Sequence, residues 1–306
     1  MKNIYEFKNK NLTWINVTKP AKPQIDFLSE KYNLNQEDVL DVLPPIQRSK
    51  IIERPDYIFM ILLFPVYDRE DGDIYTEEVD FFITKNRLIT VHSEKIPFLS
   101  DFFGSCKKNP KTSKCSGDMA NLLYEIINGL LNYCFPMLRH LNLDLEDVEH
   151  KLFKEYEKKS TVDRTVRIKT NIFDFQRIMQ SHEYVLGKLI EIAPRFFPAK
   201  KLENNFIHLA EYAREINLSL QTFKDTANAL HDANTTLVNY RVNEIAKLLS
   251  VFAVIIFPLT LLSAMFGMNT SHTPIIGTSF DFWKITGMMV MGTAVMLAFF
   301  KWRKWI

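Results

Sequence analysis

The side chains best suited to chemistry form a small and polar stripe in an otherwise apolar region near the C-terminus. They recur alternately three and four residues apart, which places them on one face of a helix: Asn239, Asn243, Ala246, Ser250, Ala253, Phe257, Thr260 and Ala264. The stripe ends at Gly267 or Asn269. Small residues of this kind allow close helix packing in membranes. Alternatively, they line a path for an ion, which is favoured because the stripe begins before the apolar segment.

Two apolar segments must position this stripe. No Asp, Glu, Lys or Arg occurs in residues 248–280, and a second uncharged run covers residues 285–300. Segments of roughly 18 residues can cross a hydrocarbon core about 30 Å thick. The short connection between them predicts a hairpin in the lipid bilayer.

Basic residues predict the orientation of this hairpin. Arg241 and Lys247 flank the first segment, whereas Lys301, Arg303 and Lys304 follow the second. Because basic residues accumulate on the cytosolic side of inner or plasma membranes, both ends of this multi-pass hairpin are expected in the cytosol.

The helix that carries the stripe is expected to begin far outside the bilayer. Residues 200–257 contain neither Pro nor Gly, so one helix over residues 205–266 would be about 90 Å long at ~1.5 Å per residue. Its first part has a heptad seam: Phe206, Leu209, Ala213, Ile216, Leu220, Phe223, Ala227 and Leu230. Because such seams pack against copies of themselves in coiled coils, this one predicts a parallel homo-oligomer.

The residues before the long helix have the patterns of an α+β cytosolic region. Strands are predicted at 12–17, 56–66, 77–84 and 87–92, short helices at 24–32 and 35–43, and longer helices at 118–153 and 163–192. The expected organisation is an α/β domain (1–116), an antiparallel helical pair (117–199), a stalk (200–247), two transmembrane helices (248–268 and 283–301) with an external loop (269–282) between them, and a basic tail (302–306).

Composition excludes several classes of function. With a formal net charge of +2 and 24% charged residues, the chain has no basic stripe for nucleic acid. It has no phosphate-binding loop, nucleophile triad or metal-hydrolase motif, so neither a nucleotide partner nor an enzyme is predicted. Cys106, Cys115 and Cys134 lack a CxxC spacing, and free thiols in a reducing cytosol are expected.

Gly267-Met268-Asn269 lies at the outer end of the first apolar segment, and this placement resembles the CorA-type magnesium channels. Residues 243–249, Asn-Glu-Ile-Ala-Lys-Leu-Leu, are similar to the family's Asn-Glu-x-x-Lys-x-Leu, and Pro258-Leu259-Thr260 to its Pro-Leu-Thr. The basic, Trp-containing tail and the order of the domains also agree. The resemblance therefore covers essentially the whole chain.

The resemblance implies a funnel-shaped homopentamer with a pore on the fivefold axis, lined by the first span. Five copies of Gly267-Met268-Asn269 would form the outer selectivity ring. Amide oxygens suit hydrated Mg²⁺, which dehydrates reluctantly. Asn243 and Thr260 would form further polar rings, and Leu249 and Phe257 would form apolar constrictions that gate by dewetting.

The resemblance also implies gating by cytosolic Mg²⁺ held between subunits by carboxylates. Asp232 occupies the matching stalk position, and Asp68 is the best match for its partner. Asp68 begins a carboxylate-rich turn over residues 68–73, which the residues alone leave open as a solvated hairpin loop or part of a divalent-cation site. Mg²⁺ is thus implied both as the transported ion and as a regulator.

The chain departs from the family pattern in three places. The external loop has no acid at 270–280, so cation attraction would rely on carbonyls, Asn269 or Asp281. Ala246 stands where a bulkier apolar residue is common, which would leave the inner gate to Leu249. His272 is expected to be a solvent-exposed loop residue rather than a ligand for a softer metal.

Three functions remain open at this point. They are a Mg²⁺ channel with Co²⁺ or Ni²⁺ as incidental ions, a zinc transporter like the ZntB relatives, and a membrane-anchored cation sensor that conducts nothing. An intact Gly267-Met268-Asn269 and the lack of a Cys/His stripe favour magnesium. With no energy-coupling motif, influx would follow the membrane potential and the ion gradient.

Overall fold

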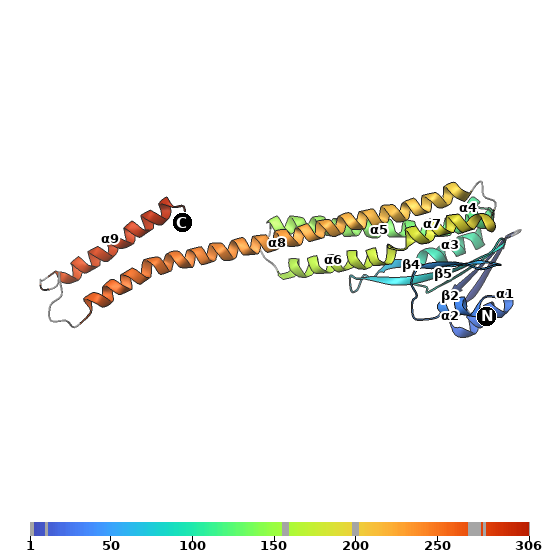
Figure 1. Ribbon diagram of the computed structural model, residues 1–306, viewed down its shortest axis with the longest axis horizontal. Helices are drawn as coiled ribbons and strands as arrows, with labels where there is room; N and C mark the ends of the chain where they lie inside the picture. The colour runs from blue at the N-terminus through green and yellow to red at the C-terminus, as the bar shows by residue number, and fades with distance from the viewer. Residues whose placement is uncertain are drawn as a thin grey trace. The chain divides into compact units, whose positions relative to one another are not determined.

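A computed structural model describes residues 3–9, 12–154, 159–197, 202–268, 277 and 280–305. The chain divides into two compact units, Met1–Leu230 and His231–Ile306. The first contains the sheet and most of the helices, and the second contains the apolar C-terminal helices (Figure 1).

The sheet of the first unit has six strands in the order β1-β2-β6-β5-β4-β3. β2 and β6 are parallel, and the other neighbouring pairs are antiparallel. The four predicted strands are confirmed as β2 (Leu12–Thr18), β4 (Ile58–Tyr67), β5 (Ile74–Ile83) and β6 (Arg87–His92). The edge strands β1 (Ile4–Asn9) and β3 (Lys50–Glu53) were not predicted.

Both faces of this sheet are covered, which explains the dense apolar run in β4. Alternate side chains of a strand point to opposite faces, so Phe82 joins one hydrophobic core and Phe81 the other. The core around Phe82 lies under α1 (Lys22–Tyr32) and α2 (Gln36–Asp41). The core around Phe81 extends into the helices that follow, α3 (Pro97–Lys108), α4 (Ser113–Ser116) and α5 (Met119–Lys154).

The predicted helix over residues 163–192 is two helices, so that prediction was wrong in its continuity. α6 (Lys159–Met179) ends before α7 (His182–Ile192), which leads into the short 3₁₀ segment η1 (Ala193–Arg195). The break follows from tertiary contacts that no local pattern reports. Asn217 donates a hydrogen bond to the Met179 carbonyl at 3.4 Å, and the fully buried His182 ring lies edge-on to Phe64.

The next helix, α8 (Leu202–Phe266), is one element of 65 residues, as predicted. Its heptad seam, however, packs inside its own chain. Leu209, Ala213, Ile216 and Leu220 are 0% exposed and belong to the core shared with α5 and α6. Gln176 and Gln221 are hydrogen-bonded across this packing at 3.1 Å. The inference that this seam requires copies of itself was therefore wrong, because helices of the same chain already cover it.

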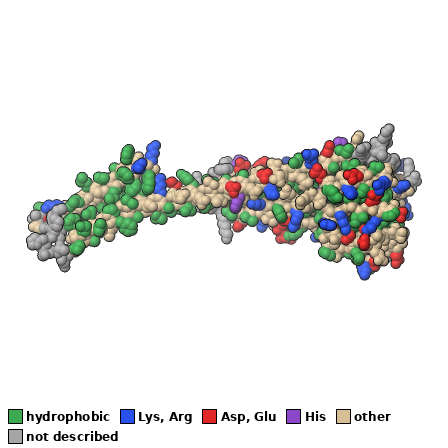
Figure 2. All heavy atoms as spheres, viewed as in Figure 1, with side chains coloured by type: hydrophobic (Ala, Val, Ile, Leu, Met, Phe, Trp, Pro, Cys, Tyr) green, Lys and Arg blue, Asp and Glu red, His purple; other side chains and the backbone are tan. Residues whose placement is uncertain are grey.

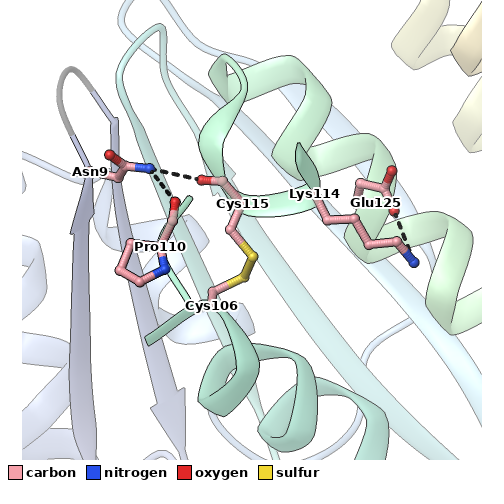
Figure 3. The surroundings of a disulfide bond; sticks show 6 residues. All are labelled: Asn9, Cys106, Pro110, Lys114, Cys115 and Glu125. Carbon is pink, nitrogen blue, oxygen red and sulfur yellow. Dashed lines mark hydrogen bonds and ion pairs between the residues drawn. A yellow bond between two sulfur atoms is a disulfide. The ribbon is translucent and has the colours of Figure 1, made fainter. Parts of the chain in front are cut away.

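The expectation of free thiols at Cys106 and Cys115 was also wrong. They form a disulfide between α3 and α4, with Cα atoms 5.5 Å apart (Figure 3). Asn9 fixes the closed segment from outside, since its Nδ2 donates to the Pro110 carbonyl at 2.9 Å and to the Cys115 carbonyl at 3.3 Å. Cys134 remains a free thiol, and burial raises its pKa.

The second unit consists of the later part of α8 and of α9 (Asp281–Trp302). Both helices are long and apolar enough to cross a membrane. Figure 2 shows hydrophobic side chains spread over their surfaces. Lys247 Nζ donates to the Lys304 carbonyl at 3.5 Å, which places the start of the first apolar segment beside the basic tail.

Candidate functional site

The polar stripe lies on the uncovered face of α8. In the second unit, Val251 and Phe300 are buried, and Ile255 and Leu262 are half-buried. At 3.6 residues per turn the stripe is on roughly the opposite face of the helix. Ala253 is half-buried, and the rest of the stripe is exposed: Asn239, Asn243, Ala246, Ser250, Phe257, Thr260 and Ala264. One copy of the chain therefore leaves this face without a protein partner among its described residues.

The hydroxyls of the stripe are bonded to the helix itself. Ser250 Oγ donates to the Ala246 carbonyl at 2.8 Å, and Thr260 Oγ1 donates to the Ile256 carbonyl at 2.9 Å. Each hydroxyl proton is thereby used, whereas the oxygen keeps lone pairs that can accept. A cation's bound waters present hydrogens outward, so these oxygens are suited to a hydrated cation.

Two bulky apolar side chains interrupt the polar character of this side of the helix. Leu249 is 61% exposed and Phe257 is 72% exposed. A ring of such side chains on a symmetry axis can exclude water from a narrow path. The arrangement thus combines oxygen acceptors with candidate apolar constrictions.

The predicted selectivity residues lie at the end of α8, and only part of them is described. Gly267 N donates to the Ser263 carbonyl at 2.9 Å, and Met268 is 60% exposed. A Cβ at Gly267 would lie 3.1 Å from the Ser263 carbonyl oxygen, which favours glycine at this helix end. Asn269 and His272 lie outside the described residues.

Asp281, the acid at the end of the predicted external loop, is held locally. Its carboxylate accepts a hydrogen bond from Gly277 N and lies 3.5 Å from Lys284 Nζ. Lys284 offsets its negative charge, which weakens the suggestion that Asp281 attracts cations to a pore mouth.

The two predicted regulatory carboxylates belong to different units. Asp68 Oδ1 accepts from Glu70 N at 2.8 Å, and its turn is fixed by Asn171, which donates to the Gly72 carbonyl at 2.9 Å. Asp232 is exposed on α8. No group of three or more His, Cys, Asp or Glu side chains in the described part of the chain could hold a metal ion.

Sequence reasoning missed two charged networks in the α/β domain. Arg54 Nη2 and Nε donate to the fully buried Asp38 at 2.7 and 3.0 Å, and Tyr57 donates to the same carboxylate at 2.6 Å. Burial, with this bond, raises the pKa of Tyr57 to about 12. Elsewhere, burial and the neighbouring Glu78 raise the pKa of Asp80 well above its usual range. Asp38 lies in a predicted helix and Asp80 in a predicted strand. An acid inside such an element was the sign in the sequence that it needs a hydrogen-bonding or charged partner.

The fold combines a sheet domain, a helical layer, a long helix whose last part is apolar and a second apolar helix. This combination is typical of membrane proteins with a large extramembrane part. The chain belongs to the family described as CorA-like Mg²⁺ transporter protein, whose model matches residues 9–302. This is a family of transporters and not of enzymes.

Individual relatives agree with this family over almost the whole chain. The Cobalt/magnesium transport protein CorA of Thermotoga maritima is 25% identical over 100% of this chain and 87% of its own length. The complete structure of the CorA magnesium transporter from Methanocaldococcus jannaschii is similar with a TM-score of 0.86, 22% identity, and coverage of 98% of this chain and 93% of that chain. The ZntB cytoplasmic domain from Vibrio parahaemolyticus matches with a TM-score of 0.62 at 16% identity, covering 76% of this chain and 90% of that one.

Proposed function

We propose that the chain is a Mg²⁺ channel of the membrane, with the polar stripe of α8 as the wall of its pore. The observation that carries this proposal is the exposure of the stripe opposite the partly covered face of α8. The named activity of CorA relatives supports Mg²⁺ as the ion, with Co²⁺ as a second substrate. Ions would move down their electrochemical gradient, since the chain has no energy-coupling motif.

The pore requires several copies of the chain around one axis. A homopentamer would bring five stripes together, with rings at Asn243 and Thr260 and constrictions at Leu249 and Phe257. Gly267-Met268-Asn269 would then form the outer selectivity ring. The basic residues beside Lys247 and in the tail support cytosolic termini. Cytosolic Mg²⁺ would bridge acids of different copies, such as Asp232 and Asp68, and this bridging would hold the pore closed.

A pair of matched substitutions tests the assignment of the pore face. Thr260→Val keeps the shape of the side chain and removes its hydroxyl. Thr286→Val does the same on α9, where Thr286 Oγ1 donates to the Phe282 carbonyl at 2.8 Å. Mg²⁺ flux into liposomes should fall in the first variant only, because only Thr260 lies on the proposed wall.

Four outcomes would contradict parts of the proposal. If the wild-type protein admits no Mg²⁺ at low internal Mg²⁺, the chain is not a Mg²⁺ channel. If it admits Zn²⁺ but no Mg²⁺, the transported ion is zinc. Equal effects of Thr260→Val and Thr286→Val would refute the pore face. Unchanged flux and selectivity in Asn269→Ala would refute the outer ring.

A further inference from the structure

The α/β domain has a hollow that is separate from the polar stripe of α8. Its volume is about 850 Å³, within the range of roughly 300–1,000 Å³ typical of small-molecule sites. The wall comes from segments far apart in sequence: the end of α1, the β3–β4 turn, the β5–β6 turn and the residues after α7. All of them belong to the first unit.

One side of this hollow offers aromatic surface. Tyr57 is 4% exposed and its ring centroid lies 5.8 Å from that of Phe82. Its hydroxyl is fixed by Asp38, as described above. Tyr32 and Phe196, also on the wall, are half-buried. Such rings provide a planar apolar surface on which a flat heterocycle can stack.

The β5–β6 turn supplies basic side chains to the hollow. Thr84 N donates to the Arg87 carbonyl at 2.8 Å, and Arg87 N donates to Thr84 Oγ1 at 2.9 Å. These bonds fix the turn that carries Lys85 and Asn86, both exposed. The Arg87 guanidinium lies over the Tyr32 ring, 4.1 Å from its centroid. A stacked guanidinium keeps its edge N–H groups free for an anion.

Two cations of the wall remain outside its ion pairs. Arg195 is paired with Glu53, and Arg54 with both the buried Asp38 and the exposed Glu37. Lys85 and Arg87 have no ion pair among the described residues, and Asp56 is the exposed acid that partly offsets them. Unpaired cations beside aromatic rings suit an organic anion with a planar ring.

We propose that this hollow binds a nucleoside phosphate. The phosphates contact Lys85 and Arg87, because guanidinium and ammonium groups form charge-assisted hydrogen bonds with phosphate oxygens. The base lies against the half-buried rings of Tyr32 and Phe196. No glycine-rich loop takes part, which is why motifs alone predicted no nucleotide partner. The proposal does not depend on which ion the chain transports.

Calorimetry on the purified full-length protein in detergent tests the site with three probes, ATP, adenosine and inorganic tripolyphosphate. Each is titrated with and without Mg²⁺, so that chelation of the ion is separated from binding. ATP is expected to bind at least tenfold more tightly than either of the other two. No heat of binding with ATP at millimolar concentration overturns the proposal. Equal affinities for tripolyphosphate and ATP also overturn it, because the base would then contribute nothing to binding.

Variants locate the binding. Lys85→Gln/Arg87→Gln should weaken ATP binding at least tenfold, whereas Lys85→Arg, which keeps the charge and leaves the stacked Arg87 in place, should keep most of it. The matched control is Lys107→Gln/Lys108→Gln, which removes two exposed charges from α3 outside the hollow. Equal losses in the control and the first variant would refute the assignment to this hollow. Thermal unfolding of each variant confirms that it is folded. An acidic peptide that displaces ATP completely and binds more tightly would overturn the nucleotide as the ligand.

Discussion

The internal burial of the heptad seam leads to a prediction that separates stability from assembly. Ile216 is 0% exposed in the core that α8 shares with its own chain. Ile216→Ala removes three carbons, worth about 0.8 kcal/mol each by transfer, and leaves a cavity that adds to the cost. The expected loss is about 3 kcal/mol in the free energy of unfolding.

That loss can be measured as a change in melting temperature. For a unit of this size, each kcal/mol shifts the midpoint by roughly 2–4 °C, so Ile216→Ala should lower it by roughly 6–12 °C. The assay is thermal unfolding of the full chain in detergent, followed by circular dichroism. Light scattering at low temperature gives the oligomeric mass, which should equal that of the wild type.

Leu249→Ala is the matched comparison, because Leu249 is 61% exposed in the single chain. Truncation there should change the stability of the first unit by no more than about 0.5 kcal/mol. It should instead increase Mg²⁺ flux if Leu249 narrows the pore. An Ile216→Ala protein that melts like the wild type but dissociates into monomers would refute the reasoning and restore the seam as an intermolecular contact.

Three further predictions concern the disulfide, a buried acid and regulation. Cys106→Ser/Cys115→Ser should lower the free energy of unfolding of the first unit by about 2.5 kcal/mol, because the loop closure is lost. If a thiol assay found all three cysteines reactive in denatured, unreduced protein, the disulfide would be absent. Burial raises the pKa of Asp80 in the folded protein, so the carboxyl holds its proton more tightly there than in the unfolded chain. The protonated carboxyl therefore contributes to stability at low pH. This contribution is lost as pH rises above about 3.9, the pKa in the unfolded chain, towards the raised pKa of the folded protein. Asp80→Asn should flatten that loss in melting curves recorded against pH. Asp232→Asn should weaken inhibition of the flux by internal Mg²⁺, and unchanged inhibition would exclude Asp232 from the regulatory site.

The sequence predicted those strands and helices whose local pattern is strong. β4 was recognisable because both of its faces are buried and almost every residue is apolar. β3 has four residues, none of them buried, so neither length nor alternation marked it. α3 was missed although Leu99, Phe103 and Cys106 are buried at helical spacing. In that case the helical spacing of the apolar residues was present in the sequence.

The candidate sites also differ in whether local sequence spacing or the tertiary fold brings their residues together. The polar stripe could be predicted because its residues are neighbours on one helix, where spacing alone fixes the face. The hollow could not, because Tyr32, Arg87 and Phe196 meet only through the fold. The disulfide could not either, since the spacing of two cysteines does not say whether their Cα atoms approach. Periodicity likewise shows that a face is buried without showing what buries it.

The two parts of α8 therefore place different demands on other copies of the chain. Up to Leu230 the heptad seam of the helix packs in the core of its own chain. Beyond His231 its polar face is exposed, and Ser250 and Thr260 satisfy their own hydroxyl protons through backbone carbonyls. Such hydroxyls can face lipid at small cost, so they alone do not require a pore. Asn243 differs, because its exposed amide has no hydrogen bond among the described residues. A primary amide at the edge of an apolar segment is costly to bury without partners, and water or another copy must supply them. Within the proposed pore wall, Asn243 is therefore the residue for which water or another copy of the chain would matter most, at the point where α8 enters its apolar part.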